Sequence, residues 1–261
     1  MSLTPDESSD VAMMFLDLTL PSPAENLACD EALLDAAESG EADEALRFWE
    51  SRDYFVVVGY ACKVEAEVNL EACGTCNVPV LRRCSGGGTI VQGPGCLNYA
   101  LILCIAEERP TRSIGAANAF IMERNRTAVS SAIRDDSSFQ QDPRPEVRVQ
   151  GHTDLTLNGL KFSGNSQRRR RNFLLFHGTF LLNFDLGRIG EVLRFPSRQP
   201  AYRRGRAHAA FLTNLGVNRE NIVNQMSKAW RAQPFQQPGL DKRINALITE
   251  KYNNRDWVQR L

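Results

Sequence analysis

Short segments rich in β-branched and aromatic residues, separated by tight-turn signals, recur along most of this sequence and limit the folds it can adopt. Residues 89–92 and 97–105 flank Gly93-Pro94-Gly95, and the strand pattern at 154–157 precedes Asn158-Gly159, a dipeptide that favours hairpins. Amphipathic helical patterns interrupt this series without the regular strand–helix–strand rhythm of parallel sheets. The pattern therefore predicts an α+β fold with a mainly antiparallel or mixed β-sheet flanked by helices.

The remaining elements follow from the same signals. Ser22-Pro23 offers an N-cap and a first-turn proline for the first helix. We expect residues 1–10 to form a flexible tail and 11–261 a single domain, with strand 45–49 paired to strand 54–59. The other expected strands are 11–20, 78–83, 147–150, a strand from the Asn158-Gly159 turn through 162, and 173–184. The expected helices are 24–38, 112–134, 186–193, 218–233 and 240–251.

Composition excludes several classes of protein. Lys and Arg number 31 and balance 31 Asp and Glu, so no net charge attracts nucleic acid or an anionic membrane. The longest apolar runs, such as 99–106, are far shorter than the roughly 20 residues that cross a bilayer. The first 20 residues contain no Lys or Arg, so we expect no secretory signal and a cytoplasmic protein.

Seven cysteines, an odd number in a long chain, favour reduced thiols over a disulfide framework. Cys73 and Cys76 form half of a possible zinc site, but no second pair follows at ligand spacing, so core or loop thiols are the alternative we expect. The run Arg168–Arg171 is either a solvated face or a docking surface for an acidic carrier domain.

Three consecutive glycines follow a strand that ends in two arginines. Gly86, Gly87 and Gly88 lose more backbone entropy on folding than other residues, and such backbone can approach a ligand closely or adopt positive φ. A cradle for a phosphate or carboxylate fits this segment, and a flexible hairpin loop is the alternative. The Lys that follows the last glycine of a Walker loop is absent.

Two further segments carry candidate functional side chains. Lys161 stands just after the hairpin turn, where it either holds an anion as a point charge or is a solvated strand residue. Asp154, on the paired strand, is either a surface residue or a Mg²⁺ ligand beside a nucleotide. His177 interrupts an apolar strand as a hydrogen-bonded core residue or as an acid or base, and Gly178 next to it permits close approach of a ligand.

In order and spacing, these segments resemble the motifs of the lipoate-protein ligase and octanoyltransferase family, which is related to the biotin protein ligases. Residues 82–88 match the RRxSGGG signature, 161–166 the KxSGxA-type motif, and 177–182 the HGTLL strand. The resemblance spans about residues 11–260. It implies a biotin/lipoate protein ligase-like catalytic domain, without the C-terminal accessory domain that many ligases carry.

The resemblance implies an ATP-dependent lipoate-protein ligase, which activates lipoate or octanoate as acyl-AMP and transfers the acyl group to a lysine of a lipoyl domain. ATP and Mg²⁺ would be its cofactors and lipoate its substrate. The acceptor would be a lipoyl-domain or carrier protein, from lipoate-dependent dehydrogenase complexes or the glycine cleavage H protein. A separate accessory-domain protein is a further implied partner, whereas nucleic acid and membrane are not.

The same resemblance assigns the site residues. Lys161 would be the catalytic cation that stabilises negative charge between carboxylate and α-phosphate, and Asp154 would hold Mg²⁺ on ATP. The residues implied in substrate and nucleotide binding are Arg82, Arg83, Ser85, Gly86, Gly87, Gly88, Ser163, Gly164, His177, Gly178 and Thr179.

Two departures from the family pattern bear on the reaction. Cysteine-dependent octanoyltransferases of this fold place a nucleophilic cysteine shortly before the motif lysine, and residues 146–154 contain none, which favours ATP-dependent ligation. Gly95-Cys96 stands where many ligases have Gly-Asn, which leaves Asn98 as the substitute contact. Two alternatives remain: an octanoyl or lipoyl transferase that uses an acyl-carrier-protein thioester, and a non-catalytic relative that binds lipoyl groups or carrier proteins.

Overall fold

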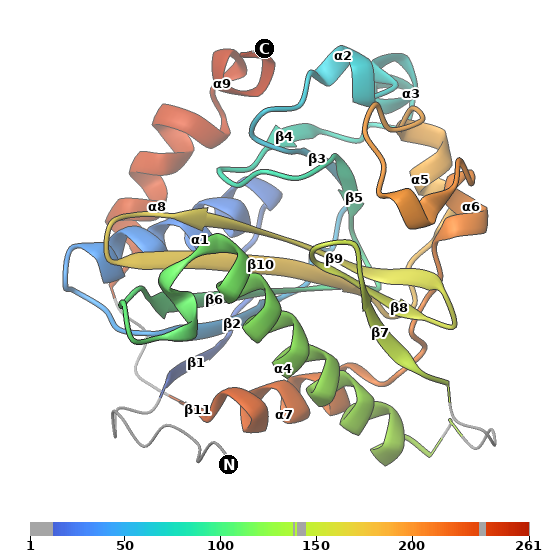
Figure 1. The fold of residues 1–261 in the computed structure, drawn as a ribbon. Coiled ribbons are helices and arrows are strands. Elements are labelled where there is room, and N and C mark those ends of the chain that lie inside the picture. The colour runs from blue at the N-terminus through green and yellow to red at the C-terminus, as the bar shows by residue number, and fades with distance from the viewer. Residues whose placement is uncertain (1–12, 138, 140–144, 235–238, 261) are drawn as a thin grey trace.

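The computed structural model describes residues 13–137, 139, 145–234 and 239–260, so the tail predicted at 1–10 lies outside the described residues. A large twisted sheet crosses the molecule with helices against both of its faces, and a small sheet lies above it (Figure 1). The predicted α+β class is confirmed. In the described part of the chain, no helix combines the length and apolar character needed to span a membrane.

The large sheet has the strand order β11-β1-β2-β6-β10-β9-β8-β7 within the described residues. Its pairs are antiparallel except at β1, which lies parallel to both β2 and β11. The strands of this sheet are β1 (Met13–Asp17), β2 (Ala45–Trp49), β6 (Cys96–Cys104), β7 (Val147–Gln150), β8 (Asp154–Leu157), β9 (Leu160–Arg169), β10 (Phe173–Leu181) and β11 (Ala232–Pro234). The small sheet has the order β4-β3-β5, with β3 (Phe55–Val58), β4 (Val80–Arg82) and β5 (Ile90–Gln92).

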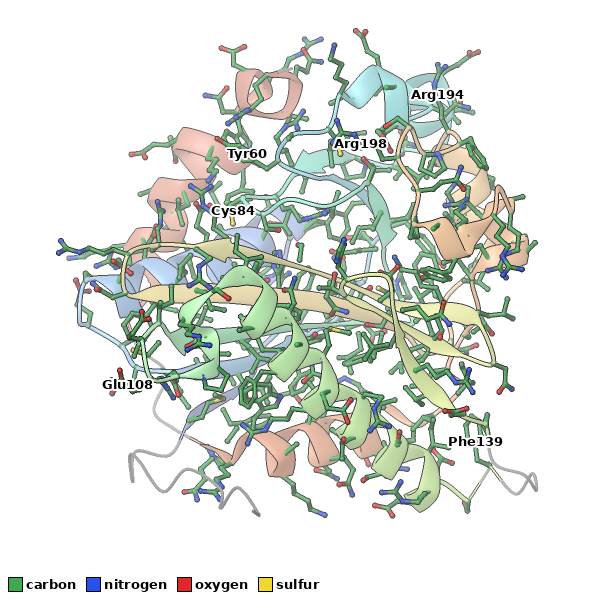
Figure 2. The ribbon with its side chains drawn as sticks, in the orientation of Figure 1. Tyr60, Cys84, Glu108, Phe139, Arg194 and Arg198 are labelled. Atoms are coloured by element: carbon green, nitrogen blue, oxygen red, sulfur yellow. The ribbon has the colours of Figure 1, made fainter. Side chains whose placement is uncertain are left out.

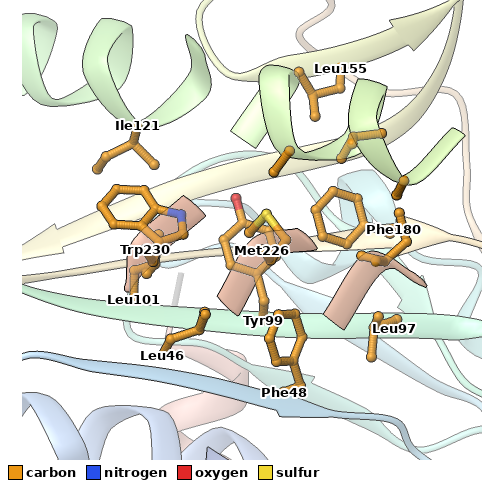
Figure 3. Close-up of a cluster of buried hydrophobic side chains, with 14 of the residues drawn as sticks. Leu46, Phe48, Leu97, Tyr99, Leu101, Ile121, Leu155, Phe180, Met226 and Trp230 are labelled. Atoms are coloured by element: carbon orange, nitrogen blue, oxygen red, sulfur yellow. The ribbon is translucent and has the colours of Figure 1, made fainter. Parts of the chain in front are cut away.

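Two long helices cover one face of the large sheet. These are α4 (Ile114–Asp135) and α7 (Arg219–Trp230), and side chains such as Ile121 and Trp230 meet Leu46, Tyr99 and Phe180 of the sheet in a buried cluster (Figure 3). Burial of this apolar surface is the main stabilising contribution on that side.

The other face is covered by α1 (Pro23–Glu38) and α8 (Asp241–Leu247) (Figure 1). Ser22 caps α1 as predicted: its hydroxyl accepts from the Glu25 amide at 3.2 Å, and the Glu25 carboxylate accepts from the Ser22 amide at 2.7 Å. The shorter helices are α2 (Val64–Glu67), α3 (Leu70–Thr75), η1 (Pro110–Arg112), α5 (Gly187–Val192), η2 (Ala201–Arg203), α6 (His208–Phe211), the π-helical turn η3 (Ile248–Tyr252) and α9 (Arg255–Gln259).

The structure corrects one predicted pairing, and it shows that one predicted turn does not join paired strands. Strands β2 and β3 do not pair with each other, and β5 and β6, which flank Gly93-Pro94-Gly95, do not form a hairpin; in both cases one strand belongs to each sheet. Both β2 and β3 are buried along their whole length, so each requires partners on both sides, which come from distant parts of the chain. Short-range turn signals cannot specify such pairings.

A buried arginine connects the elements around the first helix. Arg47 on β2 is fully buried, and its guanidinium donates to Asp30 Oδ1 at 2.5 Å and Asn26 Oδ1 at 2.7 Å. It also donates to the carbonyl oxygens of Leu18 and Asn26. A buried charge is tolerated only when it is paired and hydrogen-bonded, so these contacts fix α1 on the sheet.

We expect Arg47→Leu to lower the free energy of unfolding by about 3–5 kcal/mol, because Asp30 would remain as an unpaired buried charge. Chemical denaturation followed by circular dichroism measures the change. Arg126→Ala is the matched control, since it removes an exposed pair with Glu123 on α4 and should cost less than about 1 kcal/mol. Equal losses in the two variants would contradict the role given to Arg47.

Candidate active site

The glycine segment and the segments that carry Lys161 and His177 meet at one cavity of about 840 Å³. It lies between the large sheet and the small sheet, and the segment around η2 forms its rim. Of the predicted site residues, those that line it are Arg83, Gly87, Gly88, Asp154, Lys161, Ser163, Gly164, His177, Gly178 and Thr179. A second hollow, of about 630 Å³ beside Tyr54 and Arg219, contains none of them.

Buried polar atoms without partners concentrate in this cavity. Within the described residues, eight buried side-chain nitrogen or oxygen atoms have no hydrogen-bond partner, and five belong to residues that line it. Such atoms are rare in folded proteins and each costs roughly 1–3 kcal/mol. The five are Trp49 Nε1, Thr89 Oγ1, Gln92 Oε1, Asn98 Oδ1 and Arg203 Nη2. The cavity is therefore suited to a ligand that carries polar groups.

The glycine segment is held in one shape rather than being a flexible loop. Arg83 is buried and donates to the carbonyl oxygens of Gly86 at 2.5 Å and Gly88 at 2.8 Å. Gly87 has a φ of +82°, and a Cβ added to Gly59 would lie 2.0 Å from the Gly87 carbonyl oxygen. Burial lowers the pKa of Arg83 to about 10, which leaves it charged at neutral pH. The segment is thus a rigid cradle beside a cation.

The structure does not bring Arg82 to the cavity. Arg82 is fully buried, and its guanidinium nitrogens are all engaged with backbone carbonyls of the segment after β3 and of helix α9. Neighbouring residues of an extended chain point to opposite sides, so only one of two adjacent arginines faces the ligand. The structure places Arg82 away from the cavity, where its guanidinium holds backbone segments together, so its predicted binding of substrate or nucleotide stays without support from the geometry.

Lys161 and Asp154 form a pair at the cavity wall. Lys161 Nζ lies 2.7 Å from Asp154 Oδ1, and the Tyr202 hydroxyl donates to Asp154 Oδ2 at 2.7 Å. Burial, aided by the Asp154 charge, raises the pKa of Tyr202, so its phenol stays protonated. Gly164 leaves room for the lysine, because a Cβ there would lie 2.8 Å from Lys161 Nζ.

This pairing bears on the predicted magnesium site. Both carboxylate oxygens of Asp154 are engaged, and no group of three or more acidic, His or Cys side chains gathers around a metal position in the described part of the chain. The arrangement does not favour Mg²⁺ at Asp154. It favours a carboxylate that orients Lys161 toward the cavity.

His177 is the centre of a hydrogen-bond chain. Its Nδ1 lies 3.4 Å from Asp30 Oδ2, its Nε2 lies 2.5 Å from Ser85 Oγ, and Ser85 Oγ lies 2.8 Å from Ser166 Oγ. Ser85 is almost fully buried behind the cavity, whereas Ser166 lines it. Neither Asp30 nor Ser166 was predicted as a site residue. A signal for Asp30 is present in the sequence: Asn26 and Asp30 are polar residues four positions apart, on an otherwise apolar face of α1.

Gly178 lines the cavity and has a second role that was not predicted. A Cβ at Gly178 would lie 1.6 Å from Asn165 Oδ1, so this glycine makes room for a neighbouring side chain on β9 rather than only for a ligand. Asn165 accepts from the Tyr99 hydroxyl at 2.6 Å and donates to the Thr153 carbonyl oxygen at 2.7 Å. This network fixes β9, which carries Lys161, against the sheet.

The cysteines are not placed for nucleophilic chemistry in the cavity. None of the residues that line it is a cysteine. Cys84 and Cys96 are buried, and burial raises the pKa of each thiol to about 12, so neither is a thiolate at neutral pH. Cys84 is labelled in Figure 2. Cys73 is buried and Cys76 is exposed at the end of α3.

We expect Gly87→Val to lower the affinity for lipoate or octanoate at least about tenfold, because a β-branched residue at positive φ is strained and fills the cradle. Isothermal titration calorimetry on the folded variant measures the affinity. Gly74→Ala is the control, since a Cβ at this helical position meets nothing within 4 Å. Unchanged affinity in Gly87→Val would remove the glycine segment from the binding site.

Comparison with known proteins agrees with the geometry. The octanoyltransferase LipM of Carboxydothermus hydrogenoformans is 25% identical, over 94% of this chain and 98% of its own. The octanoyltransferase LipM of Bacillus subtilis (strain 168) is 25% identical, over 93% and 96%. The bi-partite lipoate protein ligase of Thermoplasma acidophilum, described with its E2 lipoyl domain, superposes with a TM-score of 0.75 at 19% identity, over 96% and 97%, which shows the fold.

The octanoyltransferase names overturn the prediction of an ATP-dependent lipoate-protein ligase. Ligases and transferases deliver an acyl group to the same kind of lysine, so motifs that bind the acyl group do not distinguish them. The absence of a cysteine from residues 146–154 is therefore no sign of ATP use. The model of the lipoyl protein ligase A/B catalytic domain matches residues 22–229, which include the glycine segment, Lys161 and His177, and this chain belongs to that family.

Proposed function

We propose that the protein is an acyltransferase that moves an octanoyl chain from a carrier-protein thioester to a lysine of a lipoyl-type domain. The observation that carries the proposal is a cavity with apolar walls that reaches the paired cation Lys161. The names of the curated relatives, which match over nearly their whole length, support the same reaction.

The apolar part of the cavity is suited to a medium-length acyl chain. Its side chains come from both sheets and from the segments after β10, and include Leu181, Ile189, Leu193, Phe211 and Leu212. Each methylene group that leaves water for such a surface contributes about 0.8 kcal/mol. Chain length is therefore a natural basis of selectivity here.

Lys161 and the glycine segment are suited to the charge that develops during acyl transfer. When a nucleophile attacks a thioester, the carbonyl oxygen becomes negatively charged, and a fixed cation stabilises this oxyanion more than the neutral carbonyl. Asp154 holds the Lys161 ammonium in place. In this role Lys161 stabilises a transition state and forms no covalent bond.

The rim of the cavity is basic. Arg198 lines the rim and is exposed, whereas Arg203 lies deeper, buried, with an Nη2 atom that lacks a partner among the described residues. Arg194 and Arg198, labelled in Figure 2, belong to the segment between α5 and η2. This charge favours approach of acidic carrier proteins, both the thioester donor and an acceptor such as a lipoyl domain or the glycine cleavage H protein.

The proposal is tested with purified protein, octanoyl-acyl carrier protein and an unmodified lipoyl domain, with and without ATP. We expect octanoylation of the acceptor lysine at the same rate in both cases, measured by intact-protein mass spectrometry. Free octanoate should not replace the thioester. An absolute requirement for ATP with free octanoate, together with pyrophosphate release, would contradict the proposal.

We expect Lys161→Ala to reduce kcat for this transfer by about 10² to 10³, because one preorganised oxyanion donor is lost. Lys161→Arg should rescue poorly, since a planar guanidinium does not replace a compact ammonium. The exposed Lys228 on α7 provides the control variant, Lys228→Ala, with unchanged kcat. Turnover of Lys161→Ala within about threefold of wild type would remove the lysine from the reaction.

Chain length supplies an independent prediction. A hexanoyl donor lacks two methylene groups of octanoyl, which at about 0.8 kcal/mol each should lower kcat/KM roughly 15-fold. Competition between hexanoyl and octanoyl donors, read out as the ratio of the two products on the acceptor, measures this directly. Equal use of both donors would show that the apolar wall does not contact the chain.

A further inference from the structure

Transfer through an acyl-enzyme needs a nucleophile, and no cysteine lines the cavity. The hydrogen-bond chain Asp30–His177–Ser85–Ser166 supplies one. We infer that Ser166 carries the acyl group as an oxygen ester, and that the His177–Asp30 pair activates it through Ser85. This inference rests on the proposed function.

The partners of each atom fix the direction of the hydrogen bonds. Asp30 Oδ1 accepts from Arg47, and Oδ2 faces His177 Nδ1, so the imidazole places its hydrogen on Nδ1. His177 Nε2 is then an acceptor, and the single hydrogen of the Ser85 hydroxyl lies on the 2.5 Å contact with it. The lone pairs of Ser85 Oγ then accept from Arg83 Nε, at 3.2 Å, and from the Ser166 hydroxyl, so the Ser166 hydrogen points into the chain.

The position of Ser166 distinguishes it from the other hydroxyls. Ser85 is 1% exposed and does not line the cavity, whereas Ser166 lines it and is partly exposed. Ser166 lies opposite His177 in the β9–β10 register, which places both side chains on the same face of the sheet. Ser163 is 1% exposed, and the chain of bonds to His177 does not include it. Ser166 is therefore the end of the chain that a substrate can reach.

The glycine segment completes the arrangement around Ser166. A Cβ on Gly87 would lie 3.6 Å from Ser166 Cβ, so the backbone of the segment is adjacent to the hydroxyl. The amide nitrogens of Gly87 and Gly88 donate no hydrogen bond within the described residues. Backbone amides beside a nucleophile are suited to stabilising an oxyanion, in addition to Lys161.

The reaction balances in two steps. Ser166 Oγ attacks the thioester carbonyl carbon, and its proton passes through Ser85 to His177 Nε2. The carbon–sulfur bond then breaks, and the leaving thiolate takes a proton from water. In the second step the acceptor lysine amine attacks the serine ester and the carbon–oxygen bond breaks. Ser166 Oγ then regains its proton from His177 through Ser85, and the amine loses a proton to water.

The test uses the full protein with octanoyl-N-acetylcysteamine and no acceptor. We expect one octanoyl group on the peptide that contains Ser166, in an ester that resists neutral hydroxylamine. Ser166→Ala should abolish this adduct and reduce transfer to the lipoyl domain by about 100-fold or more, and Asp30→Asn should slow formation of the adduct. Circular dichroism confirms that each variant is folded.

Two variants separate a nucleophile from a structural residue. Ser166→Cys should form an adduct that neutral hydroxylamine removes, a change of bond type that a structural role would not produce. Cys62→Ser, which alters a thiol whose Sγ donates to the Gly87 carbonyl oxygen at 3.3 Å, should retain the Ser166 adduct.

An octanoyl group on any cysteine, or transfer by Ser166→Ala within about threefold of wild type, would overturn this inference and leave the proposed function standing. Failure of the wild-type protein to modify the lipoyl domain from any thioester would overturn the proposed function instead. An octanoyl ester on Ser166 supports the inference whatever the acceptor.

Discussion

The buried contact between Arg47 and Asp30 is the interaction on which the rest of the site depends. It holds α1 against the sheet. It also orients His177, which is far from both residues in the sequence, because Asp30 Oδ2 faces His177 Nδ1. A carboxylate whose one oxygen is held by a guanidinium presents the other in a fixed direction. Folding energy and the orientation of the site therefore come from the same pair.

The antiparallel register of β9 and β10 also positions the side chains of the site. A two-residue turn begins β9, and the long pairing that follows sets Ser166 across from His177 and Gly164 across from Thr179. Because side chains alternate between faces, a slip of one residue would turn all of these groups into the apolar core on the other side. This hairpin thus carries Lys161, Ser166 and His177 to the cavity, and the small sheet brings the glycine segment to it.

Local signals in the sequence predicted much of this fold. Strand β2 and helix α1 were located within a residue because burial and capping are properties of neighbouring residues, as the Ser22 capping box illustrates. The division into two sheets and the short edge strand β11 were missed, since they depend on pairings between distant segments. The pattern of apolar residues along a strand does not specify which other buried strand it pairs with.

The candidate site likewise contains residues that local signals predicted and residues that only the fold reveals. The glycine segment, Lys161 and His177 stood out because their residue types are costly or unusual where they occur. Asp30 and Ser166 are ordinary residues, and only the folded chain brings them to His177. Arg82 and Arg83 show this limit most clearly. The sequence motif includes both, but adjacent residues of an extended chain point to opposite sides, so Arg82 contacts the Gly59 carbonyl and Arg83 the glycine segment.

The contact between Gly59 and Gly87 has a consequence for how sequences of this kind can diverge. The two residues lie in different segments, yet any side chain at position 59 would displace the carbonyl group that defines the cradle. A chain could retain every residue of the glycine segment and still lose its shape through one substitution just after β3. Position 59 therefore constrains the cradle as tightly as the glycine run does, although it lies outside that run.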